Sequence, residues 1–168
     1  MTSSFTPGNL ENNPDKILTQ ILPTSKYLKR YQVKDSDVCT RCDNGQDTVV
    51  HSISSCQLLV PYVDKIINFL KTECTVNENI TEKSYIFGCK SMGLNQIFLE
   101  LKKEVFYNKN LNACLVSFGE QFVAKIRKII VKEKLIMMDN NKFEDFCTKW
   151  QDFTAIYDYL GPDYQIII

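Results

Sequence analysis

Residues 39–56 read CTRCDNGQDTVVHSISSC, and the spacing of cysteine and histidine in this stretch organises the rest of the chain. Two residues separate Cys39 from Cys42, eight lead on to His51, and four more lead to Cys56. Thiolates and neutral imidazole are the ligands that Zn²⁺ prefers, and four of them close a tetrahedral shell. His51 is the only histidine of the chain, so the spacing was not picked out from many histidines. The pattern predicts one Zn²⁺ bound by Cys39, Cys42, His51 and Cys56; the alternative is a chance match of buried thiols and a hydrogen-bonded histidine.

Four protein ligands leave no position for water or substrate, so we expect the site to be structural and not catalytic. Such a site contributes on the order of 10 kcal/mol of folding free energy near neutral pH, which would hold a segment with little apolar material of its own. Three thiolates around Zn²⁺ leave a net charge near −1. Asp43 and Asp47 stand against Arg41 in the same loop, so the loop itself is not strongly cationic.

The segment around this motif resembles the C-terminal zinc-binding region of reverse transcriptases from LINE-type (non-LTR) retrotransposons. It carries the Leu-Pro-Thr turn at 22–24, basic residues at 29–30 and Ser36 before Cys-x-x-Cys. Asp47-Thr48 then stands where the family usually has Glu-Thr, before His-x-x-x-x-Cys and a helix. The resemblance covers about residues 20–75 and is weaker to about 150. It implies a non-catalytic module that holds template RNA or target DNA near a polymerase.

Composition predicts one globular domain, because 168 residues with 44% apolar and 24% charged residues can bury a single core. We expect residues 1–13 to be disordered, 14–75 to form the zinc-binding region with short basic helices and the first core helix, and 76–168 to pack on it as one helical unit. Seven cysteines without an apolar leader favour a reducing intracellular setting, in the cytoplasm or the nucleus. No apolar run is long enough for a membrane. The remaining cysteines are expected to be core residues: Cys74, Cys89, Cys114 and Cys147.

The charge is balanced in sum, with 20 basic and 20 acidic residues, but it is clustered along the chain. Residues 16–34 hold five bases and no acid, and residues 125–134 hold five bases and one acid. These are the first and second basic islands. We predict that bases of both islands, together with Arg41 between the first two predicted ligands, contact RNA or DNA backbones with low sequence specificity. The predicted contact residues are Lys26, Lys29, Arg30, Lys34, Arg41, Lys125, Lys128 and Lys132. For the second island a solvated helix face is an equal alternative.

Hydrophobic periodicity predicts a mainly α fold, a small helical domain with the Cys-Cys-His-Cys zinc knuckle near its N-terminal side. Pro14 starts one short helix, which Pro23 ends, and Thr24 or Ser25 caps another with bases on one exposed face. Apolar stripes predict longer helices over 58–74, 94–105 (with Glu100, Lys103 and Glu104 outward) and 118–138. Residues 139–141 should cap a last helix to residue 157, whose aromatic residues we interpret as core. Residues 85–87 fit a short strand or a helical turn.

Catalytic functions fit poorly. A polymerase of the resembled family needs an Asp-Asp pair, and the chain contains no such dipeptide. A zinc deaminase needs His-x-Glu with Pro-Cys-x-x-Cys, whereas Ser52 and Ile53 follow His51. Two functions therefore stay open. The clustered bases and the resemblance favour a nucleic-acid-binding module, and the neutral net charge favours a protein-interaction or scaffold domain whose zinc is purely structural.

Overall fold

The computed structural model describes residues 23–107 and 115–157, and these residues form helices and loops without a β-strand. This confirms the mainly α prediction. The expected disordered N-terminus and the helix after Pro14 lie outside the described residues. The helices, including one π-helix and one 3₁₀-helix, are α2 (Ser25–Arg30), π-helix η1 (His51–Ser55), α3 (Val60–Glu73), α4 (Glu82–Phe87), α5 (Met92–Tyr107), α6 (Leu115–Asp139), α7 (Phe143–Trp150), 3₁₀-helix η2 (Gln151–Phe153) and α8 (Thr154–Tyr157).

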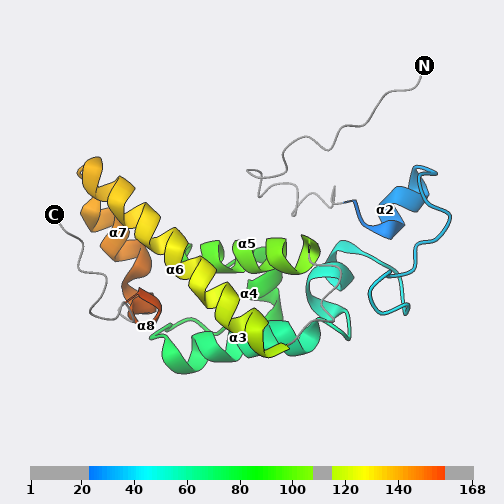
Figure 1. Ribbon diagram of the computed structural model, residues 1–168, viewed down its shortest axis with the longest axis horizontal. Helices are drawn as coiled ribbons and strands as arrows, with labels where there is room; N and C mark the ends of the chain where they lie inside the picture. Colours follow the sequence, from blue (N-terminus) through cyan, green and yellow to red (C-terminus); the bar gives the residue numbers. More distant parts are fainter. Residues whose placement is uncertain (1–22, 108–114, 158–168) are drawn as a thin grey trace, which may run out of the picture.

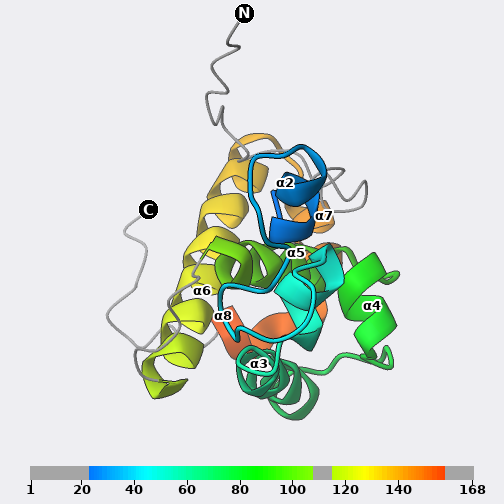
Figure 2. The ribbon, with the colours of Figure 1, turned by 90° about the vertical axis from the view of Figure 1, so that its right-hand side faces the viewer.

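Helix α2 and the segment that carries the predicted metal ligands, residues 36–58 (the metal loop), lie at one end of the molecule. The hairpin of α6 and α7 lies at the other end (Figure 1). Turned by 90°, the view shows η1 and the loop in front of α5, with α3 below them (Figure 2). Helix α6 packs on α3, α5, α7 and α8. A single apolar cluster runs from Cys39 and Cys56 through these helices to Ile156. Two of the predicted metal ligands are therefore part of the core.

Helix α3 forms as predicted, directly after the last predicted ligand. Pro61 lies in its first turn, where the missing N–H costs no helical hydrogen bond. The predicted stripe faces inward, with Tyr62, Val63, Ile66 and Leu70 buried. Leu59, immediately before the helix, is buried too. The ligand Cys56 is thus anchored to a helix that the core holds in place.

Residues 85–87 belong to helix α4, which settles the choice between strand and helix. Thr81 and Ser84 form a capping box at its start, in which each side chain bonds the other residue's backbone N–H. Gly88 ends the helix with φ 95°, a conformation that L side chains rarely adopt. The buried Tyr85 hydroxyl donates to the carbonyl of Ile53 at 2.9 Å, and this bond ties α4 to η1.

Helix α5 buries the predicted stripe, but it also buries charges that were expected to face outward. Glu100 is only 7% exposed, and Lys102 only 8%. The prediction is wrong for Glu100 because α6 covers that face, bringing Lys125 Nζ to 3.5 Å from its carboxylate. Lys102 is covered by the end of α4, where its Nζ donates to the carbonyl of Ile86 at 2.9 Å. A stripe identifies the most apolar face of a helix, and it does not say how many other faces neighbours cover.

The connection between α6 and α7 differs from the predicted cap at residues 139–141. Lys142 is the N-cap of α7 and makes no side-chain capping bond. Asn140 instead donates its side-chain amide to Ile136 O at 2.7 Å, at the C-terminal end of α6. Asn141 adopts φ 56°, and the N–H of Lys142 donates to Met137 O at 2.8 Å, which is a left-handed helix stop. Asparagine here ends one helix and does not start the next.

The last helical segment is broken, whereas one continuous helix to residue 157 was predicted. Helix α7 ends at Trp150, and the chain continues through the 3₁₀-helix η2 into α8. The prediction that its aromatic residues are core is confirmed for Phe146, Trp150 and Phe153, which are buried. Phe143 is exposed, and the side chain of Tyr157 lies outside the described residues.

The cysteines outside the motif are not all core residues. Cys74 is buried as predicted, Cys89 is half-buried and Cys147 is exposed, while Cys114 lies outside the described residues. Cys147 was placed in the core wrongly because it neighbours Phe146 in sequence, and the next residue of a helix points some 100° away around its axis. None of the described helices is both long enough and apolar enough to cross a membrane.

Candidate metal centre

The structure brings the four predicted ligands together. One ligand atom from each of Cys39, Cys42, His51 and Cys56 lies within 4.8 Å of the others. The Nε2 of His51 is 3.4 Å from Cys42 Sγ. A zinc tetrahedron has S–N edges of about 3.6 Å and S–S edges of about 3.8 Å, given bonds of about 2.0 to 2.3 Å. The residues fit a tetrahedral metal ion after a contraction of about 1 Å at the widest edge. The cluster is wider than the spread of roughly 4 Å expected for a bound ion and narrower than the 6 Å that would have excluded one.

A tight turn presents Cys39 and Cys42 to the same point. The N–H of Cys39 donates to Gly45 O at 3.0 Å, the N–H of Asp43 donates to Cys39 O at 2.9 Å, and an antiparallel bridge pairs Val38 with Gln46. The turn reverses through two left-handed residues, Asp43 at φ 51° and Gly45 at φ 72°. Glycine suits its position because a side chain there would be strained.

His51 and Cys56 are placed by the π-helix η1, which the sequence reasoning did not predict. The N–H of Cys56 donates to His51 O at 3.0 Å, so the wide turn joins one ligand directly to the other. Thr48 accepts the N–H of His51 on its side-chain oxygen at 3.1 Å. The available signal was this threonine three residues before His51, because a Thr in that position caps the start of a helix.

Arg41 is half-buried, and its guanidinium is turned toward backbone carbonyls of η1 and α5. Its guanidinium donates to Ser52 O at 3.2 Å and to Val105 O, at the end of α5, at 2.7 Å. Its Nε is buried without a hydrogen-bond partner. The guanidinium also lowers the pKa of the Cys56 thiol. The Arg41 side chain thus joins the metal cluster to α5, and its role as a phosphate-contact residue stays a prediction.

The pKa values of Cys42 and Cys56 shift in opposite directions. Burial raises the pKa of Cys42 to about 11, and the neighbouring Cys39 and Cys56 sulfurs add to the rise. Burial also acts against ionisation of Cys56, but the N–H of Leu58, Cys42 and Arg41 outweigh it and leave the pKa of Cys56 lowered. A bound cation would remove the repulsion between the thiolates, so metal binding at this cluster would release protons.

Asp47 fastens helix α2 to the metal loop. Its buried carboxylate accepts the N–H of Ser25 at 2.7 Å and the hydroxyl of Ser52 from η1. The N–H of Lys26 donates to the Asp47 carbonyl at 3.3 Å. Because Thr24 also caps α2 on the N–H of Tyr27, the helix begins on the loop with its N-terminal donors paired.

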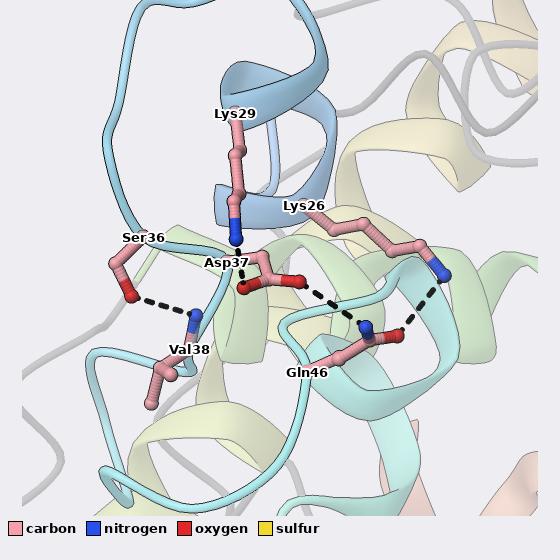
Figure 3. Close-up of polar contacts among 6 residues, drawn as sticks. All are labelled: Lys26, Lys29, Ser36, Asp37, Val38 and Gln46. Carbon is pink, nitrogen blue, oxygen red and sulfur yellow. Dashed lines mark hydrogen bonds and ion pairs between the residues drawn. The ribbon is translucent and has the colours of Figure 1, made fainter.

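The described bases of the first basic island lie at or near the surface, and three of them form hydrogen bonds or an ion pair within the protein; Figure 3 shows those of Lys26 and Lys29. Lys29 forms an ion pair with Asp37 at 2.8 Å, Gln46 donates to the other oxygen of Asp37 at 3.1 Å, and Lys26 donates to Gln46 at 3.1 Å. Lys34 donates to Ser25 Oγ at 3.3 Å, and Arg30 is exposed at the end of α2. These contacts hold the basic helix against the loop and leave their cations at the surface.

The second basic island lies on α6, and its lysines differ in their contacts: Lys125 forms ion pairs, whereas Lys128 and Lys132 are exposed. Lys125 lies 2.7 Å from Glu104 and 3.5 Å from Glu100, and these carboxylates raise the pKa of Lys125 against the effect of its burial. Lys128 and Lys132 are exposed, and with Lys125 they line a surface hollow of about 420 Å³. Lys125 therefore has two local counter-ions that the sequence order did not reveal.

Comparisons with known proteins give this chain no relative: no protein-family model, curated protein or solved structure matches it. Its function is therefore argued from the metal centre and the surface around it.

Proposed function

We propose that this chain is a non-catalytic zinc-binding module that binds RNA or DNA through backbone phosphates, as part of a LINE-type reverse transcriptase or a fragment of one. The observation that carries the proposal is the position of α2. A basic helix starts on the loop that holds the metal ligands, and Asp47 bonds the two together. A metal ion that orders this loop would also fix the cations of α2, and the resemblance of residues 20–75 points to the same use.

Zn²⁺ is the ion that best suits the donor set of the cluster. Three cysteines and one histidine are a common ligand set for structural zinc, and soft thiolates disfavour Mg²⁺ and Ca²⁺. The thiolates need a reducing setting, which supports an intracellular location in the cytoplasm or the nucleus. The absence of an Asp-Asp pair, and of a second histidine to act as a catalytic base, supports a module without polymerase or hydrolase activity of its own.

The first basic island offers phosphates four described cations, Lys26, Lys29, Arg30 and Lys34, and Lys128 and Lys132 of the second island are exposed as well. The exposed ion pair between Lys29 and Asp37 opposes phosphate binding by only about 0 to 1 kcal/mol, so a phosphate can displace Asp37. Four phosphate contacts give a slope of log affinity against log salt of roughly −3.6 on duplex DNA and roughly −2.8 on single strands. Backbone contacts alone predict little base specificity.

The test is binding to single-stranded RNA, single-stranded DNA and duplex DNA across a salt series. Changing Lys29 and Arg30 together to Ala should weaken binding and flatten the slope by up to about two, with the zinc content unchanged. Lys71→Ala with Lys83→Ala is the matched control, because both lysines are exposed on helices α3 and α4. A double mutant that binds like the parent would remove this island from the proposal.

A protein-interaction or scaffold domain with purely structural zinc is the second candidate. Its specific support is a group of exposed apolar residues around α2 and the metal loop: Tyr31, Val33, Val38 and Val50. The counter-ions of Lys29 and Lys125 support it as well. If no salt-dependent binding to RNA or DNA occurs in the micromolar range, this candidate replaces the first.

A further inference from the structure

A cavity of about 800 Å³ lies among the end of α4, the first half of α5, the C-terminal half of α6 and helix α7. This volume is in the range of roughly 300 to 1,000 Å³ that is usual for small-molecule sites. Its apolar lining comes from three of these helices and consists of Ile86, Phe87, Met92, Leu99 and Met137. It contains no residue of the metal centre and no base of either basic island.

Lys102 supplies a buried positive charge to this cavity. The residue is 8% exposed, its Nζ donates to Ile86 O at 2.9 Å, and the ring centroid of Tyr85 is 5.5 Å from Nζ. None of the ion pairs within residues 23–107 and 115–157 includes it. Burial lowers its pKa to about 8, so the amine is still protonated at neutral pH. A buried ammonium is normally paired with an anion, and this one lines an open volume.

The carboxylates near the cavity are not aimed at Lys102. Glu133 accepts from Lys149 Nζ at 2.6 Å and from Trp150 Nε1 at 3.2 Å, so both of its oxygens are engaged. Asp145 lines the cavity from an exposed position on α7. Within the described residues, the cavity thus has one buried cation, Lys102, that forms no ion pair with a carboxylate.

The opening of the cavity carries two exposed apolar side chains beside charged ones such as Lys90 and Asp145. Phe87 is 70% exposed and Met92 is 62% exposed, and both line the same opening. Large apolar side chains that gather at the mouth of a cavity mark a surface that a ligand or partner covers. The site therefore combines the exposed apolar side chains of Phe87 and Met92 with the buried cation of Lys102.

We propose that this cavity binds a small amphipathic anion, whose carboxylate or phosphate head pairs with Lys102 and whose apolar body packs against Phe87 and Met92. The inference is independent of the metal centre and of nucleic-acid binding. A head group of either kind supplies the missing counter-ion, and an apolar body removes the rim from water.

The test is titration calorimetry of the zinc-loaded full chain with decanoate and decyl phosphate, below the concentrations at which they form micelles. Both should bind, decanol should bind at least tenfold more weakly, and affinity should rise about fourfold per methylene from hexanoate to decanoate. The stronger of the two anions identifies the preferred head group. Absence of binding by both anions at millimolar concentration would overturn the proposal and leave the rim as a protein-contact surface, and equal binding of decanol would overturn the role of Lys102.

Two kinds of variant test the head group and the apolar body separately. Lys102→Met removes the charge, keeps an unbranched side chain one heavy atom shorter, and should weaken decanoate binding at least tenfold. Lys83→Met changes an exposed lysine of α4 outside the lining and should leave binding unchanged. Phe87→Ser changes a residue that is already exposed, so the fold should persist, and binding should weaken severalfold. Circular dichroism checks each fold. If Lys102→Met fails to fold, a rise in the Lys102 pKa of the parent chain on saturation with decanoate, followed by NMR of the Cε carbon, decides the point, and an unchanged pKa would overturn the proposal.

Discussion

The metal loop, residues 36–58, and the helical body, residues 60–107 and 115–157, are held by different interactions. The body packs large side chains such as Trp150, Phe98 and Leu101, which are fully buried. The loop buries few large apolar residues and depends on backbone turns, the carboxylate of Asp47 and the four ligand side chains. Apolar burial stabilises the body without any ligand, whereas a bound ion would bring the four ligand atoms of the loop to bonding distance.

Several hydrogen bonds connect these regions, and two of them join the loop to helices distant in sequence through buried or half-buried side chains. Arg41 donates from the loop to Val105 O of α5, and Tyr85 of α4 donates to Ile53 O of η1. Ile53 and Leu59 are fully buried, so η1 belongs partly to the body. We therefore expect loss of the metal to loosen the turn at Cys39 and Cys42 and the attached α2, while the body keeps its packing.

The largest effect should come from removing a metal ligand. Cys42→Ser should lower the zinc content below one per chain and reduce the hydrogen-exchange protection of residues 24–60 by several kcal/mol, because a structural zinc contributes on the order of 10 kcal/mol. Helices α5 to α7 should keep their protection. Cys147→Ser is the matched control, since Cys147 is exposed on α7 and should leave the zinc content at one. Equal loss of protection across the whole chain would show that the two regions are one cooperative unit.

The next largest effect should come from the opposite end. Trp150→Ala removes a fully buried side chain and should lower the free energy of unfolding of the body by about 3 to 5 kcal/mol, measured by urea unfolding. The zinc content should stay at one per chain under native conditions. Loss of the metal in this variant would contradict the separation of loop from body.

A smaller effect should separate α2 from the loop. Asp47→Ala leaves Ser25 N–H and the Ser52 hydroxyl without this acceptor and should cost about 2 to 3 kcal/mol, as expected for bonds to a charged group. Hydrogen exchange should accelerate in residues 24–31 with the metal still bound. Asp43→Asn removes an exposed carboxylate of the same loop with a residue that also tolerates φ 51°, and it should change stability by less than about 0.5 kcal/mol. Unchanged exchange in α2 would show that Asp47 does not hold it.

The smallest effect concerns the buried charge of the body. The unfolded chain keeps the Lys102 proton up to a pKa near 10.5 and the folded chain releases it near 8, so between these values the unfolded state binds more protons and stability rises with pH. Below pH 8 the folded state bears the full cost of the buried ammonium. The stability of Lys102→Met relative to the parent should therefore be greatest near pH 7 and should decrease by pH 10. If the stability of Lys102→Met relative to the parent increased with pH, the lowered pKa of Lys102 in the folded chain would be contradicted.

The sequence predicted features that depend on local spacing. The ligand set followed from four residue positions, and the stripes of α3, α5 and α6 gave those helices nearly to their observed ends. It did not predict features that depend on which neighbour covers a surface. Glu100 and Lys102 are buried by α6 and α4, and Arg41 turns inward because carbonyls of η1 and α5 lie within its reach.

Two local features were missed for another reason. The π-helix at His51 depends on bonds five residues apart, which leave no apolar period to detect. Asn140 and Asn141 are good residues both for starting a helix and for ending one, and only the position of α6 decides that they end it. Sequence chemistry permitted both outcomes, and packing selected one.

The most direct test of the metal centre is cobalt titration of the reduced, metal-free chain, followed by visible absorption. We predict intense d–d bands of tetrahedral Co²⁺ with thiolate charge-transfer absorption, saturation at one equivalent and displacement by one equivalent of Zn²⁺. Cys42→Ser should lose this spectrum, and Cys147→Ser should keep it. Weak octahedral bands, no saturable binding, or an unchanged spectrum in Cys42→Ser would contradict a metal centre formed by Cys39, Cys42, His51 and Cys56.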